Sequence, residues 1–436
     1  MLRITLLCLG FLAFLVSADP VKIPLYRRSE SGLAVAAGKQ LDHGILAGKV
    51  QIGEPPEEFT LAFDTTTGFS WVRGSRCKSE NCLDRCTYYA RHSSTVKSTK
   101  HKFSVEYGDA CVDTRVYLDT FRFANITVHD MPFGGAYRMS GFGHGFDGYL
   151  GLGRSVNFNS TKIHSSSSGG LAKRAIALPD SAFVPNAYQQ ATGLDSAQFG
   201  MYTTTTSNDG FSQTGASQQQ QQQQTTTTSG GLGFAKRSTN AQPDEPVGGY
   251  LVMGGVDKTA IQGDVQYIDL ARTDEAQNWD VCIRDANFDG ELNLKQKKNA
   301  LASISSSSSQ IVMPRDQADQ FHDVFGGRFN HTSRAYQFVC CEAEKLPSLK
   351  LTLEDTIVEL PSKYWVEKTA EGDEGCCATC ATRISRGNTN RDWVLGTAFT
   401  NAFYTTFDPE GERIGLALKK DNNDEGLRIY KKTPHH

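Results

Sequence analysis

Two stretches of this 436-residue chain share one pattern, which constrains the fold more than any other feature. The first, at 61–72, reads LAFDTTTGFSWV, and the second, at 302–313, reads ASISSSSSQIVM. In each, apolar or small residues lead into a hydroxyl-rich turn, and an apolar run follows. The flanking apolar residues favour an ordered turn over a linker at the serine run.

Each stretch is followed at a similar distance by an apolar pair before a glycine, in YLGLG at 149–153 and in WVLGT at 393–397. Asp64 lies 87 residues before Gly151, and Ser305 lies 91 residues before Gly396. Repetition of a module at nearly equal internal spacing predicts two related lobes.

The rest of the pattern is that of β-structure. Short runs rich in Val, Phe, Thr and Tyr, such as FTLAFD and HKFSVEYG, stand between Gly, Asn and Asp turns from about Ile45 onward. We therefore expect an all-β, bilobal chain with few short helices, its lobes at 41–257 and 258–425.

Two insertions, near 155–180 and 206–246, interrupt the first lobe. Both are poor in apolar residues, and the second contains seven consecutive glutamines. Such segments cannot bury enough apolar surface to offset the entropy of ordering, so we expect them to be disordered. Each contains a Lys-Arg pair, Lys173-Arg174 and Lys236-Arg237, and the sequence does not decide whether these are processing sites or incidental surface residues.

The N-terminal segment, 1–18, has an early Arg, an apolar core and a small-x-small ending, which is typical of a cleaved secretory signal. Residues 19–40 are interpreted as a propeptide remnant or an extension. The tail, 426–436, is polar, so we expect no membrane anchor. These features predict a secreted, extracellular protein, with a vacuolar or cell-wall destination left open.

The cysteines support that route. Ten remain after removal of the signal, and an even number in an oxidising compartment favours disulfides. Cys376-Cys377-x-x-Cys380 is also compatible with a metal or redox motif, but without histidines nearby we favour disulfides and expect no metal or cofactor. Sequons at Asn125, Asn159 and Asn330 predict glycosylation.

Charge does not indicate a polyanionic partner. The 45 basic and 48 acidic side chains nearly balance, so the sequence predicts neither nucleic-acid nor membrane binding by the chain as a whole.

From about Ile45 to Leu418, the chain resembles the pepsin-like aspartic peptidases, eukaryotic secreted enzymes. LAFDTTTGFSWV is similar to the family's first active-site strand and turn, and VEYGDA, with Tyr107 and Gly108, is similar to its flap hairpin. FDGYLGLG, GYLVMGGVD and FYTTFDPEGERIGLA match further segments in the family's order. The resemblance implies two β-barrel-like lobes flanking a cleft.

The resemblance also implies a chemistry. In the family, two facing carboxylates share one proton, because like charges so close cannot both ionise, and together they activate a water. Asp64 supplies one carboxylate, but Ser305 stands where the second belongs. A serine hydroxyl can take neither role at working pH, and loss of one general acid or base forfeits about 10²–10⁴ in rate.

Other positions keep or change the family's pattern. Thr65 and Ser306 retain hydroxyls that, in the family, reach across to the opposite lobe, whereas Thr66 replaces a glycine and Thr67 a serine. Thr397 replaces an aspartate, and Ser307 continues the second turn. The resemblance implies disulfides between Cys77 and Cys82, and between Cys340 and either Cys376 or Cys377.

Three functions remain open. The first is an impaired or inactive pseudoprotease, a monomer that binds peptides or proteins in its cleft. The second is an active acid endopeptidase whose missing carboxylate comes from Asp316 or Asp319. The third is a glycosylated surface protein with a vestigial cleft, whose low-complexity tracts carry the function.

Overall fold

The computed structural model describes residues 32–83, 85–156, 162–163, 180–204, 247–273, 278–331, 335–343, 345–369 and 378–432. The predicted signal peptide, most of both insertions, both Lys-Arg pairs and Asn159, Cys376 and Cys377 lie outside these ranges. Strands dominate the described residues, which confirms the all-β prediction. The α-helices there are short: α1 (Phe183–Gln189), α2 (Arg315–Phe325), α3 (Cys340–Ala343) and α4 (Thr397–Thr400).

One long sheet runs through both halves of the chain. Its order is β12-β26-β25-β10-β11-β1-β2-β3-β8-β4-β7-β6-β5-β9. Its strands are β1 (Ala34–Gln40), β2 (Leu46–Ile52), β3 (Glu57–Asp64), β4 (Ser70–Arg73), β5 (Lys97–Tyr107), β6 (Ala110–Phe123), β7 (Ile126–Ser140), β8 (Gly148–Gly151), β9 (Lys162–Ile163), β10 (Phe199–Thr203), β11 (Gly249–Met253), β12 (Ile261–Asp269), β25 (Phe403–Asp408) and β26 (Arg413–Lys419).

Two further sheets come from the second half of the chain. The larger has the order β23-β16-β24-β15-β13-β19-β20-β27, with β14 paired to β13, and the smaller has the order β17-β18-β22-β21. Their strands are β13 (Asp280–Phe288), β14 (Leu292–Leu294), β15 (Leu301–Ile304), β16 (Ile311–Met313), β17 (Arg328–Asn330), β18 (Ala335–Val339), β19 (Leu349–Leu353), β20 (Thr356–Leu360), β21 (Val366–Lys368), β22 (Thr379–Thr382), β23 (Ile384–Arg386), β24 (Trp393–Leu395) and β27 (Arg428–Lys431).

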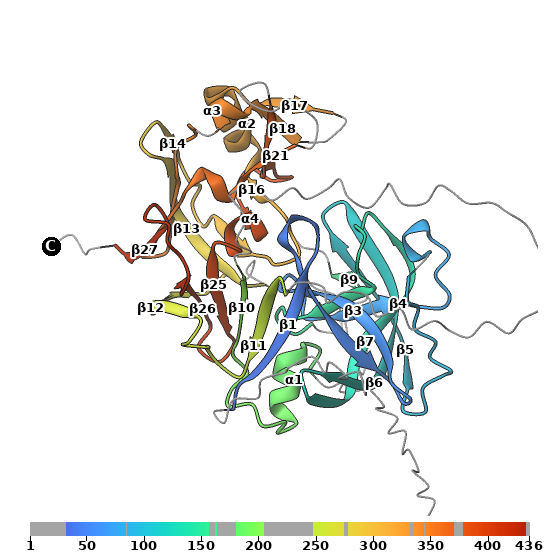
Figure 1. Ribbon diagram of the computed structural model, residues 1–436. Helices are drawn as coiled ribbons and strands as arrows, with labels where there is room; N and C mark the ends of the chain where they lie inside the picture. Colours follow the sequence, from blue (N-terminus) through green and yellow to red (C-terminus); the bar gives the residue numbers. More distant parts are fainter. Residues whose placement is uncertain are drawn as a thin grey trace, which may run out of the picture.

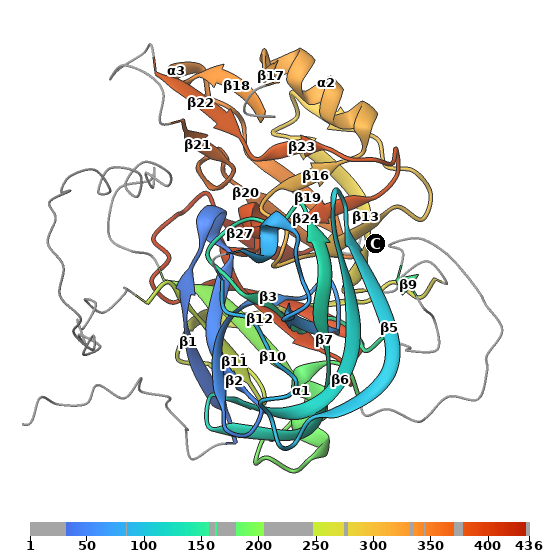
Figure 2. The same ribbon diagram turned by 90° about the vertical axis from the view of Figure 1, so that its right-hand side faces the viewer.

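Six strands join the two lobes at their base. In Figure 1, β12, β26, β25, β10, β11 and β1 lie side by side from the left to the centre, with the other N-terminal strands in blue and cyan to their right and the orange C-terminal strands above them. Figure 2 shows the lobes one above the other, with this shared layer beside the lower one. Residues 34–40 form β1 and pair with both β11 and β2. We had expected these residues to belong to a propeptide remnant or an N-terminal extension.

The two active-site modules have the same strand pairing. In the first lobe, β8 pairs parallel with β3 and antiparallel with β4, and β4 continues into a parallel pairing with β7. In the second lobe, β24 pairs parallel with β15 and antiparallel with β16, and β16 pairs parallel with β23. The repeat read from the sequence therefore corresponds to one structural unit present twice.

The glycine after each apolar pair is required by close backbone approach. A Cβ on Gly151 would lie 2.4 Å from the backbone nitrogen of Phe69. A Cβ on Gly396 would lie 2.4 Å from the carbonyl oxygens of Gln310 and Ser308. No side chain fits at such distances, so each glycine lets its strand pass directly behind its active-site turn.

An aromatic contact extends the core across the lobe junction. Trp279 is buried, and its ring lies 6.0 Å from that of Phe199 and 5.1 Å from that of Phe407, centroid to centroid. Its indole N–H donates to the carbonyl of Leu152 at 3.2 Å. This one side chain therefore packs against the central sheet while bonding the segment behind the first active-site turn.

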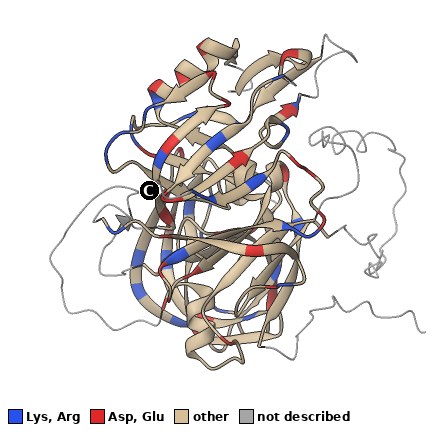
Figure 3. Cartoon of the chain, turned by 90° about the vertical axis from the view of Figure 1, so that its left-hand side faces the viewer, with Lys and Arg blue, Asp and Glu red and all other residues tan. Residues whose placement is uncertain are grey.

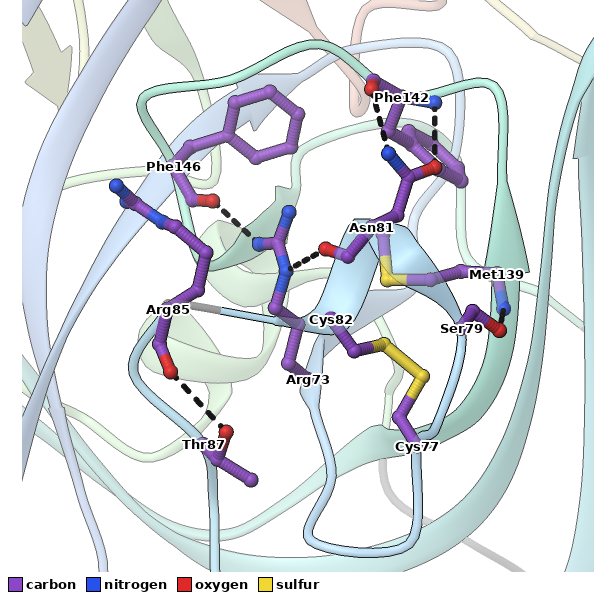
Figure 4. Close-up of a disulfide and its surroundings, with 10 residues drawn as sticks. All are labelled: Arg73, Cys77, Ser79, Asn81, Cys82, Arg85, Thr87, Met139, Phe142 and Phe146. Atoms are coloured by element: carbon purple, nitrogen blue, oxygen red, sulfur yellow. Dashed lines mark hydrogen bonds between the residues drawn. A yellow bond between two sulfur atoms is a disulfide. The ribbon is translucent and has the colours of Figure 1, made fainter.

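The disulfide between Cys77 and Cys82 closes a small loop, as the resemblance implied. Figure 4 shows how this loop is held: Asn81 exchanges two hydrogen bonds with the backbone of Phe142, at 3.1 and 3.2 Å. Buried Arg73 donates to the carbonyls of Asn81 and Phe146 from below. The loop thus fixes the segment that follows β7.

The second disulfide corrects the implied pairing. Cys340 is bonded to Cys380, not to Cys376 or Cys377. The cause is the register of β18 and β22, which pairs Val339 with Thr379 and brings the two α-carbons to 4.9 Å.

Candidate active site

The two active-site turns are tied together by reciprocal hydrogen bonds. The hydroxyl of Ser306 accepts from the backbone N–H of Thr65 at 3.0 Å and donates to the carbonyl of Phe63 at 2.6 Å. The hydroxyl of Thr65 accepts from the N–H of Ser306 at 3.0 Å and donates to the carbonyl of Ile304 at 3.1 Å. Both side chains are buried. We call these four bonds the hydroxyl clasp.

Asp64 ends β3 and is completely buried beside the clasp. Its Oδ1 accepts from the N–H of Thr66 and from the hydroxyl of Ser307, both at 2.8 Å. Its Oδ2 accepts from the hydroxyl of Thr67 at 2.8 Å and from that of Tyr107 at 3.0 Å. A carboxylate offers about four acceptor positions, so these donors occupy all of them.

Two opposing effects act on the pKa of Asp64. Burial is the larger and raises the pKa above its ordinary value of 3.8, because the ionised form loses its hydration. Hydrogen bonds from Ser307, Thr67, Thr66 and Tyr107 lower it, because each stabilises the carboxylate. The net pKa is raised.

A hydroxyl cluster surrounds Ser305, the residue at which the resemblance implies the second carboxylate. Ser305 follows β15 and is buried, and its Oγ lies 2.8 Å from the hydroxyl of Thr66 and accepts from the N–H of Ser308 at 3.0 Å. Thr66 Oγ1 also lies 2.8 Å from the hydroxyl of Ser307. Thr66 has a negative φ, so the backbone accommodates its β-branched side chain without strain.

Tyr107 closes over this cluster from the tip of the β5–β6 hairpin, where Gly108 supplies a positive φ. Besides its bond to Asp64, its hydroxyl accepts from the indole N–H of Trp71 at 3.1 Å. Burial, and next the charge of Asp64, raises the pKa of Tyr107 well above its ordinary value, so the phenol stays a donor. Phe142, which Asn81 holds, packs against the Tyr107 ring at 5.6 Å.

Comparison with known families decides the assignment. The model of the eukaryotic aspartyl protease family matches residues 46–228 and 238–419. The chain belongs to this family. The two turns, the clasp and the β5–β6 hairpin all lie within the matched residues.

Curated relatives cover most of the chain at low identity. Bovine pregnancy-associated glycoprotein 1 is 25% identical over 86% of this chain and 81% of its own length. Cathepsin E-B of Xenopus laevis is 23% identical over 85% and 78%, and dog pepsin B is 21% identical over 85% and 80%. The pepsin-like fold has a substrate-binding cleft between its lobes.

The alternative carboxylates do not reach this aspartyl protease site. Asp316 and Asp319 both lie on α2, after the strand that leaves the second turn. Asp319 forms an ion pair with Arg386 at 2.8 Å, and the backbone of Asp316 is bonded to Asn390. Neither is among the four partners of Asp64.

Arg383 is a site residue that the sequence did not indicate. It donates to Thr397 at 2.6 Å and to the carbonyl of His43 at 2.8 Å, and it also bonds the carbonyl of Ser309. Burial lowers its pKa to about 10, with Glu367 acting in the opposite direction. Thr397, where the family has an aspartate, thus serves as a neutral acceptor for a buried cation.

The candidate glycosylation sites differ in their surroundings. Asn125 is exposed at the β6–β7 turn. Asn330 ends β17, is half-buried and donates to the Gln337 side chain at 2.9 Å. The described residues contain no cluster of His, Cys, Asp and Glu suited to a metal, and no helix within them is long and apolar enough to cross a membrane.

The clasp predicts that Ser306 contributes more to the stability of the fold than Ser308 does. Ser306→Ala leaves the Thr65 N–H and the Phe63 carbonyl buried and unpaired, so we expect the free energy of unfolding to fall by about 3 kcal/mol. Ser308→Ala is the matched control, because its hydroxyl makes only a 3.5 Å contact with Gln310. Urea unfolding of both variants checks this, and equal losses would contradict the clasp's role.

The raised pKa of Asp64 predicts a pH-dependent stability difference from Asp64→Asn. Between the ordinary pKa of 3.8 and the raised one, the folded state holds more protons than the unfolded state. The wild type should therefore lose stability relative to the variant as pH rises through this window, by about 1.4 kcal/mol per unit of raised pKa. Urea unfolding of both proteins from pH 3.5 to 7 tests this, and a constant difference would argue against it.

Proposed function

We propose that this aspartyl protease family member is a pseudoprotease that binds peptides or proteins in the cleft between its lobes without hydrolysing them. The observation that carries the proposal is the saturation of Asp64. All four of its acceptor positions are taken by donors from the protein, namely Thr66, Thr67, Ser307 and Tyr107. A catalytic water needs one of those positions, and one opens only when a bound peptide displaces the Tyr107 hydroxyl.

The second lobe supports the same conclusion. Hydrolysis requires two carboxylates that share a proton, and Ser305 offers a hydroxyl whose pKa is far above working pH. Thr66 Oγ1 lies between Ser305 and Ser307, at 2.8 Å from each, where a water shared by two carboxylates would need space. Both proton transfer and placement of the water are therefore disfavoured.

Peptide binding needs fewer groups of the candidate active site than hydrolysis does. The clasp and the flap hairpin keep the lobes and the cleft roof in the family's arrangement, and neither needs a second carboxylate. The bond from Tyr107 to Asp64 holds the flap closed, so a peptide must displace this hydroxyl to enter. We expect the chain to bind as a monomer.

Two other functions have less support. An active acid endopeptidase would need a replacement carboxylate, but Asp319 is paired with Arg386 and Asp316 is exposed on α2. A surface protein acting through its low-complexity tracts remains testable by deleting residues 207–240, since loss of function in that variant would favour it.

The decisive experiment measures cleavage of a denatured protein substrate at acid pH. We expect none from the wild type or from Ser305→Asp alone, because Thr66 still contacts position 305. Ser305→Asp with Thr66→Gly should gain cleavage, about 10² or more above background, because a second acid or base is restored. Asp64→Asn in that background should abolish it.

Binding is measured in parallel. Peptides from the same denatured substrate should be retained by the immobilised wild type and by Asp64→Asn alike, because retention does not use the carboxylate as an acid or base. Cleavage by the wild type that Asp64→Asn removes would overturn the proposal, and so would failure of both proteins to retain any peptide.

We also propose that the protein enters the secretory route. The segment at 1–18 supports this, and two disulfides among the described residues fit an oxidising compartment. The mature N-terminus should lie beyond residue 18 in protein recovered from the medium of expressing cells. Recovery only from the cytosol, with residues 1–18 intact, would contradict secretion.

A further inference from the structure

The outer face of the β5–β6–β7 ribbon carries unpaired positive charge. Lys100, Lys102 and Arg115 are exposed there, and within the described part of the chain none of them forms an ion pair with a carboxylate. We call these three residues the basic face. In Figure 3, blue segments follow one another along the strands at the left edge of the N-terminal lobe.

Two residues of the basic face, Lys102 and Arg115, lie close enough to repel each other. The register of β5 and β6 places Lys102 directly opposite Arg115. Like charges at opposed positions destabilise a sheet, since the two Cβ atoms lie only about 4.5–5.5 Å apart. Folding alone gives no reason for this pair.

Protection of a sheet edge explains only part of the pattern. Lysines on an edge strand discourage pairing with other chains, and β5 lies next to the edge of the sheet. Arg115, however, lies on β6, which is paired on both sides, with β5 and with β7. An interior strand needs no such protection, so Arg115 requires a different explanation.

The backbone of β5 is irregular at Lys100. The pairing of β5 with β6 shifts register between Ser98 and Lys102, and Lys100 has a φ of 65°. Positive φ is uncommon for a lysine, and bulges of this kind re-aim a side chain. Thr99 stabilises the bulge by donating to the carbonyl of Val116 at 2.7 Å and accepting from the N–H of His101 at 3.2 Å.

Neighbouring side chains extend the array without cancelling it. Lys97 is paired with Asp130 at 2.7 Å, and Arg138 with Asp113 at 2.5 Å. The Lys102 ammonium lies 5.8 Å from the centre of the Tyr137 ring. Three cations without a carboxylate partner therefore lie in this region beside two ion pairs and Glu106, although the whole chain has a formal charge of −3.

We propose that the basic face binds a linear sulfated polysaccharide. Same-face residues repeat about every 6.6–6.8 Å along a strand, and neighbouring strands lie about 4.7–4.9 Å apart, so the cations form a closely spaced array on the ribbon. A flexible polymer with anionic groups along its length can follow such an array. This binding is separate from the cleft and does not depend on the proposed function.

A nucleic acid fits the same face less well. Single-stranded nucleic acid is bound through aromatic platforms on which bases stack. Tyr137 is the aromatic side chain beside Lys102, and the ammonium lies over its ring, so that surface is already in use.

The binding test uses the full-length mature protein and a size-defined heparin fragment. We expect binding that weakens as NaCl is raised, and an affinity about ten-fold lower for Lys102→Gln/Arg115→Gln, because two exposed ion pairs are lost. Arg328→Gln is the matched control, since Arg328 is an exposed strand residue opposite uncharged Gln337. It should bind like the wild type.

Two further probes identify the ligand class. A desulfated fragment of equal length should bind more weakly than the sulfated one, and an oligothymidylate of equal charge should not match the sulfated fragment. Equal affinity of the double variant and the wild type for heparin would overturn the proposal. Equal binding of the oligothymidylate would overturn it in favour of nucleic acid.

Stability supplies an independent readout. Arg115→Gln removes the repulsion with Lys102, so its urea midpoint should rise above that of the wild type at low salt, and the gain should shrink in 0.5 M NaCl. Arg328→Gln should show no such gain. A lower midpoint for Arg115→Gln at low salt would show that the arginine is there for folding and would overturn the argument.

Discussion

The hydroxyl clasp is the interaction on which the rest of this structure depends. Ser306 and Thr65 each bond one N–H and one carbonyl of the opposite turn, so each hydroxyl acts as donor and acceptor at once. The clasp satisfies four buried backbone groups at the point where the lobes meet. It places Asp64 and Ser305 in facing turns whatever residue stands at position 305.

Because the clasp uses only hydroxyls and backbone, it does not depend on a carboxylate at position 305. Asp64 then becomes a structural acceptor. Burial raises its pKa, and donors from both lobes and from the flap surround it. Removing the carboxylate would leave those donors unpaired, which gives a physical reason for its retention without catalysis.

The sequence predicted the parts of the fold that follow from local chemistry. The internal repeat indicated the two turns and the glycine that follows each, whereas the roles of Asp64 and Tyr107 came from the resemblance to the family. The partner of Cys340 could not, because three cysteines stand within five residues and only the β18–β22 register selects Cys380. The role of Arg383 was also hidden, since its partners come from segments far apart in the chain.

The two residues that differ from the family's pattern, at positions 66 and 305, pack against each other. Thr66 replaces a glycine and Ser305 an aspartate, and their hydroxyls lie 2.8 Å apart. A carboxylate at 305 would compete for the space that the threonine side chain occupies, and a glycine at 66 would leave the hydroxyl of Ser305 without this partner. Each change therefore makes the other more favourable. A change at either position alone would therefore cost packing or hydrogen bonding at the other.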